Sequence, residues 1–320
     1  MATADQIKNL IKAHYDQSEE RFKTAALRIA ASEAKQGHTK LARDIKAIVD
    51  SSSRKTYRAI SLSNKDGLCD IAYPSLDKND LVVSKELQDK IFRVLTEYRN
   101  KEKLAAYGLS NRRKILLEGA PGTGKTMTAA SIASALSLPL FTVRVDKLIT
   151  KYLGETSVKL RQIFDTINSI QAVYFFDEFD AIGADRSLDN EVGEMRRILN
   201  SFLQFIENDH SNCLILAATN NRKILDQALF RRFDDIFHYS LPSVEEIKAI
   251  VANKTGAFDP NFTLKQSIAE SMLCLCQADI ARLCDDAIKE ALLADATLSN
   301  EVFESLVEDR LTIYTDQRVG

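Results

Sequence analysis

Residues 119–126 read GAPGTGKT, a run that joins small residues to one lysine and one hydroxyl. Gly122 and Gly124 carry no Cβ, so the backbone can curl closely around phosphate oxygens with its N–H groups pointing inward. In such a loop the lysine ammonium lies on the β- and γ-phosphates, and the last hydroxyl ligates Mg²⁺. The run therefore predicts binding of ATP with magnesium through Ala120, Pro121, Gly122, Thr123, Gly124, Lys125, Thr126 and Met127.

Two carboxylates, Asp177 and Glu178, directly follow the apolar segment 173–176. An apolar strand that ends in a pair of acids is the Walker B pattern, in which the first acid holds magnesium. We therefore expect Asp177 to bind Mg²⁺ together with Thr126, and Glu178 to act as the base that polarises the attacking water. The alternative is that the two acids only cap the next helix.

The segments around these residues alternate between strand and helix patterns. Short apolar runs predict strands at 114–118, 140–144, 172–176, 213–218 and 236–239, and the segments 125–136, 156–167 and 191–206 predict helices. The glycine loop thus lies between a strand and a helix, which is the context that phosphate binding requires. We expect a P-loop NTPase fold, an α/β fold with a mostly parallel sheet and helices on both faces.

Helical patterns replace the strands after Pro242. Ser243 and Glu246 have the spacing of a capping box, and helical spacing continues to about residue 310, which predicts a small all-helical lid domain. Residues 4–50 also have helical spacing, broken near Gly37, and predict a helical N-terminal extension. The expected organisation is an N-terminal helical region at 1–53, a linker at 54–80, an α/β subdomain at 81–241, the helical lid at 242–310 and a tail at 311–320.

The composition is that of an ordinary globular protein, with 45% hydrophobic residues, 28% charged residues and a net charge of −2. Residues 1–114 carry a balance of +8 and residues 115–320 a balance of −10. This asymmetry indicates either complementary surfaces within or between subunits, or contact of the front segment with an acidic partner such as nucleic acid. Five cysteines without zinc spacing, no signal pattern and no apolar run of about 20 residues predict a cytoplasmic protein without membrane contact.

Residues 81–310 resemble the AAA+ ATPases. Beside the glycine loop and the two acids, two further stretches carry this resemblance. Residues 217–220 (AATN) are similar to the family's sensor-1 strand, which implies that Asn220 helps to place the lytic water. Residues 225–234 (LDQALFRRFD) resemble the stretch that carries arginine fingers, so Arg231, Arg232 or both would reach into the ATP site of the next subunit. Many members separate the two arginines with Pro-Gly, whereas here they are adjacent. The resemblance implies a homo-oligomer, a hexameric ring with ATP bound between subunits.

Lys151, Tyr152, Leu153 and Gly154 resemble the pore loop of members that thread substrates through the centre of the ring. In that role Tyr152 presses on a peptide backbone of any sequence, Leu153 adds apolar grip and Gly154 lets the loop move. The alternative is a hydrophobic staple at the start of the following helix. In the lid, Gln277 stands where the family often has glycine, so the contacts between the lid and the nucleotide do not follow from the resemblance.

The resemblance implies Mg²⁺-dependent ATP hydrolysis that is coupled to remodelling or unfolding of a protein substrate, or to control of a partner effector such as a separate serine protease. The short N-terminal helices and single ATPase module are similar to small bacterial AAA+ proteins that act beside a protease. There are two alternatives. One is a nucleic-acid-directed loader that uses the basic front segment, and the other is an ATP-gated regulator that restrains a partner toxin or defence effector.

Overall fold

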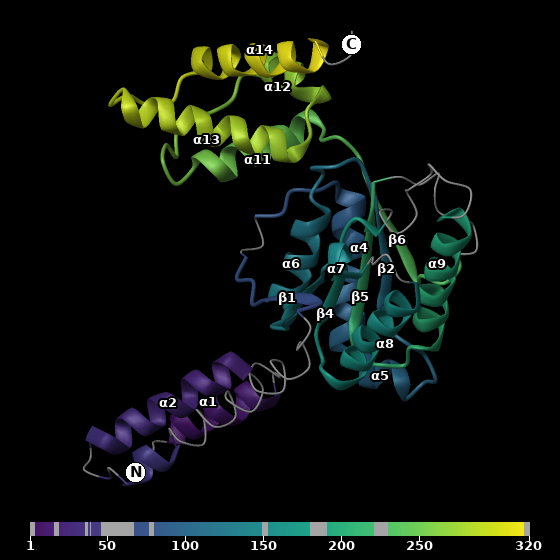
Figure 1. Ribbon diagram of the computed structural model, residues 1–320. Helices are drawn as coiled ribbons and strands as arrows, with labels where there is room; N and C mark the ends of the chain where they lie inside the picture. Colours follow the sequence, from purple (N-terminus) through teal and green to yellow (C-terminus); the bar gives the residue numbers. More distant parts are fainter. Residues whose placement is uncertain are drawn as a thin grey trace. The chain divides into compact units, whose positions relative to one another are not determined.

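The structure, a computed structural model, describes residues 4–15, 19–35, 38, 40–45, 67–76, 80–148, 153–179, 191–220 and 230–316. The chain separates into two units, Met1–Cys69 and Asp70–Gly320. The second unit contains the parallel strands and the C-terminal helices. Figure 1 labels these elements and colours the chain along its sequence.

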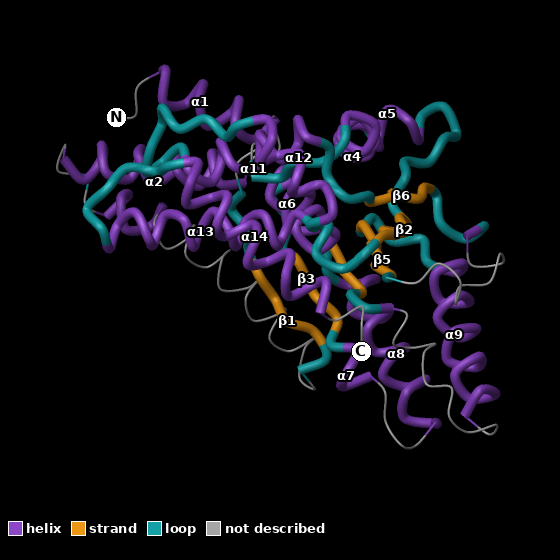
Figure 2. The backbone as a smooth tube through the Cα atoms, turned by 90° about the horizontal axis from the view of Figure 1, so that it is seen from above, coloured by secondary structure: helices purple, strands orange, loops and turns teal. Residues whose placement is uncertain are grey.

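A mostly parallel sheet lies at the centre of the second unit. The order of its strands is β1-β3-β4-β5-β2-β6, and Figure 2 shows several of them side by side in orange. The pairs β2–β5, β2–β6, β3–β4 and β4–β5 are all parallel. The bounds are β1 Cys69–Ala72, β2 Lys114–Gly119, β3 Leu140–Val143, β4 Val173–Phe176, β5 Leu214–Thr219 and β6 Asp235–Tyr239. The predicted α/β fold with a mostly parallel sheet is therefore confirmed.

Helices cover both faces of this sheet, which is why its central strands read as continuous apolar runs. On one face, α4 (Lys85–Arg99) and α6 (Lys125–Leu136) share a core with alternate residues of the strands, such as Leu117 and Phe175. On the other face lie α8 (Leu153–Ser169) and α9 (Glu191–Asn208). There Phe164 and Phe202 contact the ring of Phe176, with centroid separations of 6.3 Å and 5.0 Å. Two short helices, α5 (Lys101–Ala105) and α7 (Val145–Leu148), complete this part.

The C-terminal helices form a lid with a core of its own. They are α11 (Val244–Thr255), α12 (Gln266–Ser271), the 3₁₀ helix η3 (Met272–Cys274), α13 (Gln277–Leu293) and α14 (Asn300–Asp316). The predicted capping box is confirmed, because the Ser243 hydroxyl accepts the N–H of Glu246 while the Glu246 carboxylate accepts the N–H of Ser243. Ile247, Ile280 and Phe303 are fully buried between these helices. The last helix continues to residue 316, beyond the predicted end near 310.

The spacing predicts two helices over residues 4–50, divided near Gly37, whereas the described residues of this region form helical stretches at 4–15, 19–35 and 40–45. Helix α1 ends at Tyr15, α2 spans Glu19–Lys35, and residues 40–45 are helical again. The two helices pack against each other, and Ala26, Ile29 and Ala30 are buried. An isolated amphipathic helix leaves such side chains in water, and the packing of α1 on α2 covers them.

Part of the predicted linker at 54–80 forms a strand. Residues 69–72 are β1, next to β3 in the sheet, and Leu68 and Cys69 are buried. Four residues are too few for the alternation that reveals a strand, so the sequence pattern there resembles a loop.

The described helices are amphipathic. In α4, for example, Leu87, Ile91 and Val94 are buried, whereas Lys85 and Asp89 are exposed and form an ion pair. Among the helices that the structure describes, none has both the length and the apolar character needed to cross a bilayer.

Candidate functional site

Three strands bring the predicted polar residues to one edge of the sheet. Strands β2, β5 and β4 are parallel neighbours, so their carboxyl ends meet at the same edge. The glycine loop follows β2, Asn220 follows β5, and Asp177 and Glu178 follow β4. Because β5 lies between the other two strands, Asn220 is placed between the loop and the acids. The structure thus gathers the predicted phosphate, magnesium and water-positioning residues at one place.

The glycine loop has a backbone that depends on glycine at two positions. Gly122 has φ +76° and Gly124 has φ +98°, both in the left-handed region that other residues rarely adopt. A Cβ on Gly122 would also lie 2.4 Å from Sγ of Cys276 in the lid. Within the loop, the Thr123 hydroxyl donates a 2.7 Å hydrogen bond to the carbonyl of Ala120. The loop is therefore a fixed turn in close contact with the lid.

Lys125 is nearly buried, with only 6% of its surface exposed. Its Nζ donates to the carbonyl oxygens of Gly119 and Ala120, each at 2.8 Å. These bonds hold the ammonium against the loop and offset part of the free-energy cost of burying its charge. Contact of this ammonium with phosphate stays a prediction.

The Thr126 hydroxyl and the Asp177 carboxylate meet across the site. Oγ1 of Thr126 donates to Oδ2 of Asp177 at 2.9 Å, and Oδ1 of the same carboxylate accepts the N–H of Glu178 at 2.9 Å. Glu178 itself has φ +49° and an exposed side chain. A hydroxyl beside a carboxylate is the hard oxygen pair that Mg²⁺ takes in nucleotide sites, so these residues fit that ion. Thr126 and Asp177 are the residues that would hold it.

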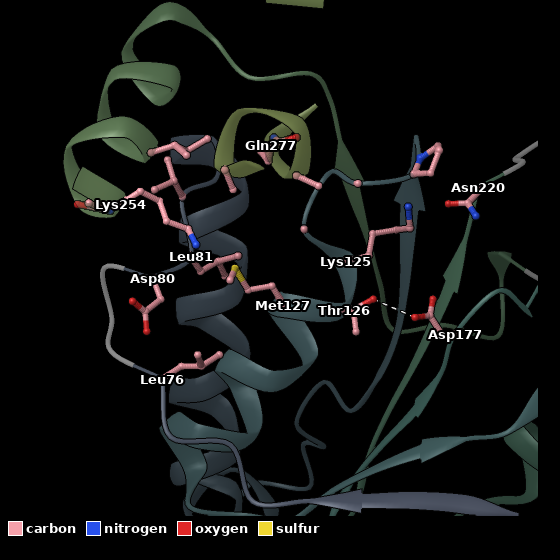
Figure 3. A pocket seen from close by; sticks show the side chains of 18 of the residues that line it. Leu76, Asp80, Leu81, Lys125, Thr126, Met127, Asp177, Asn220, Lys254 and Gln277 are labelled. Atoms are coloured by element: carbon pink, nitrogen blue, oxygen red, sulfur yellow. Dashed lines mark hydrogen bonds between the residues drawn. The ribbon is translucent and has the colours of Figure 1, made fainter. Parts of the chain in front are cut away.

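These residues open onto a cavity of about 690 Å³, a size typical of small-molecule sites. Figure 3 shows Lys125, Thr126, Asp177 and Asn220 toward one end, and Leu76, Asp80 and Lys254 toward the other. The lining of the cavity also includes an apolar group that the sequence reasoning missed: Leu81, Val82, Ile250 and Ala281. A polar end beside an apolar wall suits a ligand with charged phosphates and a flat base.

The lid contributes to this cavity directly. The N–H of Ala278, in the first turn of α13, donates to the carbonyl of Gly122 at 3.0 Å. Gln277 donates through Nε2 to the carbonyl of Ser240 at 3.2 Å, so its amide binds the connection between β6 and the lid. In the sequence, the resemblance singled out Gln277 in the lid, and it did not reveal Ile250 or Leu81.

The two arginines that resemble fingers lie away from this edge. Asp234 accepts the N–H groups of Arg113 and Lys114 at 2.8 Å and 2.9 Å, which fixes the end of the arginine stretch to the amino end of β2. The glycine loop follows the carboxyl end of that strand, about 17 Å away at 3.3 Å per residue. Arg231 is exposed, and the Nε of Arg232 pairs with Glu207 at 3.2 Å. The structure therefore does not bring these arginines to the glycine loop of their own chain.

The predicted pore loop falls partly outside the described residues. Lys151 and Tyr152 are not among them, while Leu153 and Gly154 begin α8. Its role stays a prediction.

Comparison with known proteins supports the same kind of site. Residues 115–241 match the model of the ATPase family associated with various cellular activities (AAA). The chain is similar to the uncharacterized AAA family ATPase y4kL of Sinorhizobium fredii (strain NBRC 101917 / NGR234), with 33% identity over 305 residues, 92% of this chain and 90% of that protein.

Two longer proteins are also similar over part of their length. Nuclear valosin-containing protein-like of Mus musculus is 32% identical over 240 residues, 71% of this chain and 28% of that protein. The peroxisomal ATPase PEX6 of Penicillium chrysogenum is 28% identical over 246 residues, 73% of this chain and 17% of that protein. The chain thus spans less than a third of these two relatives, whereas its likeness to the bacterial protein extends over about nine tenths of both chains. The chain belongs to the AAA family of ATPases.

Proposed function

We propose that this ATPase works as a ring of identical subunits, in which Arg231 of one subunit completes the ATP site of the next. The observation that carries this proposal is the separation of Arg231 from its own glycine loop by the length of β2. Among the described residues, no arginine lines the cavity. Negative charge builds on the γ-phosphoryl group during transfer, and an arginine that neutralises it is worth roughly 10³–10⁵ in rate. A second copy of the chain can supply that charge.

Within one subunit, the residues at the carboxyl ends of the strands have distinct roles in ATP hydrolysis. Glu178 accepts a proton from the attacking water, and its exposed carboxylate at the cavity suits that task. Asn220 orients the same water through its amide, and the N–H groups of the glycine loop hold the phosphate oxygens. Thr126 and Asp177 hold Mg²⁺, which neutralises phosphate charge when bound with the nucleotide.

Arg231 is the better candidate for the shared arginine. Its side chain is exposed, and no hydrogen bond or ion pair holds it within the described part of the chain. Arg232 is only partly exposed, and its guanidinium is paired with Glu207. Phe233, which is buried, anchors the pair to the domain. The guanidinium that has no partner among the described residues of its own subunit is the one available to a neighbour.

The test is complementation between two inactive variants. Arg231→Ala keeps its own cavity but lacks the arginine, and Lys125→Ala lacks ATP binding but still carries Arg231. Each variant alone should hydrolyse ATP at about 10⁻³ of the wild-type rate or less. An equal mixture should regain activity, because Lys125→Ala subunits complete the sites of Arg231→Ala subunits. A mixture no more active than its components, or a fully active Arg231→Ala variant, would overturn the shared site.

We further propose that the ring remodels a protein substrate, or controls a partner protein, through the loop at 151–154. Support comes from the position of α8, which begins at Leu153 and carries Phe164. The ring of Phe164 stacks on Phe176, which directly precedes Asp177, at 6.3 Å between centroids. Movement of Asp177, the carboxylate proposed to hold Mg²⁺, can therefore be transmitted along α8 to the residues next to Tyr152.

The experiment uses an ATP-trapped form to find the substrate. Glu178→Gln should bind ATP without hydrolysing it, so captured proteins can be identified by mass spectrometry after pull-down. Tyr152→Ala should then abolish remodelling of a captured protein while ATP turnover continues. Tyr107→Ala, at a tyrosine that is 79% exposed, is the control for loss of an aromatic ring. Full remodelling by Tyr152→Ala would refute the role of the loop, and ATPase stimulation by DNA or RNA would favour the loader instead.

A further inference from the structure

A short chain of buried hydroxyls connects the end of β6 to the glycine loop. The Tyr239 hydroxyl donates to Oγ1 of Thr128 at 2.7 Å, and the Thr128 hydroxyl donates in turn to the carbonyl of Gly124 at 3.1 Å. Thr128 is fully buried and Tyr239 is 7% exposed. No motif of the phosphate site includes either residue, and neither was singled out from the sequence.

The direction of these hydrogen bonds determines how they hold the Gly124 carbonyl. The Tyr239 hydroxyl fills one lone pair of the Thr128 oxygen, so the hydrogen of Thr128 is directed to Gly124. The Gly124 carbonyl also accepts the backbone N–H of Thr128 at 2.9 Å. Two donors therefore fix this carbonyl. Burial raises the pKa of the Tyr239 phenol above its usual value, so the hydroxyl keeps the proton that it donates.

Fixing this carbonyl also fixes the amide on the other side of the peptide bond. A trans peptide is planar, so the N–H of Lys125 points opposite to the carbonyl of Gly124. That N–H belongs to the first residue of α6, where no intrahelical acceptor exists. In P-loops, backbone N–H groups at this place cradle phosphate oxygens. Gly124 has φ +98°, which glycine adopts readily, so loss of the hydroxyl bond leaves the backbone N–H of Thr128 to hold the orientation of this peptide.

We infer that Tyr239 is a positioning residue for phosphate binding, which acts through the Thr128 hydroxyl to aim the Lys125 amide at the nucleotide. Tyr239 is well placed for this because β6 is parallel to β2 and pairs Tyr239 with Gly119, the residue at which the glycine loop begins. The inference rests on nucleotide binding by this AAA ATPase and is independent of the proposed ring.

The test removes only the hydroxyl. Tyr239→Phe should weaken ADP binding and raise KM for ATP by the same factor, about fivefold for one lost hydrogen bond. The turnover number at saturating ATP should stay within about twofold, because the amide holds substrate and transition state alike. Tyr98→Phe, in helix α4, is a matched control. Tyr98 is also 7% exposed, and its hydroxyl accepts a 2.7 Å hydrogen bond from the side-chain amide of Gln171. This control should lower the melting temperature and leave ADP affinity unchanged.

Variants of Thr128 test the route of the effect. Thr128→Val should weaken ADP binding at least as much as Tyr239→Phe, and Thr128→Ser, which keeps the hydroxyl, should restore near-normal affinity. In the Thr128→Val background, Tyr239→Phe should add nothing, because both changes break the same chain of bonds. Additive losses would overturn the inference. So would a Tyr239→Phe protein that loses stability as Tyr98→Phe does but binds ADP as the wild type does.

Discussion

Oγ1 of Thr126 and Oδ2 of Asp177 lie 2.9 Å apart, and their hydrogen bond joins the helix after the glycine loop to the end of β4. Each residue belongs to a different motif, 51 positions apart in the chain. The bond therefore shows that the two motifs form one oxygen-rich site, as Mg²⁺ with a bound nucleotide requires.

Asp177→Asn should remove the effect of Mg²⁺ on ATP binding, because the amide keeps the shape of the carboxylate but not its charge. We expect turnover to fall at least about 100-fold, since the ion supplies several kcal/mol of charge stabilisation. Titration of ATP by calorimetry, with Mg²⁺ and with EDTA, measures this. Asp165→Asn, at an exposed acid of α8, is the control and should behave as the wild type. An Asp177→Asn protein that still binds ATP more tightly with Mg²⁺ would contradict the assignment.

Glu178→Gln should keep ATP affinity and lower turnover by about 10²–10⁴, the usual contribution of a general base. The backbone adds a second prediction, because Glu178 has φ +49°, which costs an ordinary residue roughly 1–2 kcal/mol. Glu178→Gly should therefore be about 1 kcal/mol more stable than Glu178→Ala, although both are inactive. Urea unfolding of the two variants measures the difference, and equal midpoints would show that the backbone there is unstrained.

The elements with strong local patterns were predictable from the sequence. The run 173–176 is apolar because both faces of β4 are covered, and Ser243 and Glu246 satisfy each other over one turn. The edge strand β1 was not predictable, because it depends on β3, a partner distant in sequence. Short elements receive their stability from such partners rather than from their own pattern.

The site follows the same rule. Residues of the glycine loop and the acids after β4 were predictable, because phosphate and magnesium chemistry restricts both the residue types and their spacing. The apolar lining at Leu81 and Ile250 was not, since any large aliphatic side chain can fill such a wall. Arg231 and Arg232 were equivalent in the sequence, and the structure distinguishes them by the greater exposure of Arg231 and the ion pair of Arg232 with Glu207.

Gly122→Ala should weaken ATP binding by about tenfold or more, because the new Cβ would lie 2.4 Å from Sγ of Cys276. The Cys276 side chain or the lid must then shift, and we expect this to weaken the 3.0 Å bond from Ala278 to Gly122. Gly108→Ala controls for backbone strain: Gly108 has φ +72°, close to the +76° of Gly122, but nothing lies within 4 Å of its Cβ position. Nucleotide titrations of both variants measure the effect. Partial recovery in Gly122→Ala with Cys276→Ala is expected, and equal affinities for the two single variants would contradict the role of the lid contact.

Arg232→Ala should leave ATP turnover within about threefold of the wild type and cost at most about 1 kcal/mol of stability. Its partner Glu207 is 60% exposed, and an ion pair this open to solvent contributes little. Glu207→Ala removes the same pair from the other side and should give the same small loss of stability. Arg231→Ala, by contrast, should keep its unfolding free energy and lose turnover, because Arg231 is exposed and pairs with no other residue that the structure describes. Turnover and urea unfolding of the three variants decide the matter. If Arg232→Ala were the inactive variant and Arg231→Ala the active one, the arginine given to the neighbouring site would be Arg232, and its pair with Glu207 would have to open for each catalytic cycle.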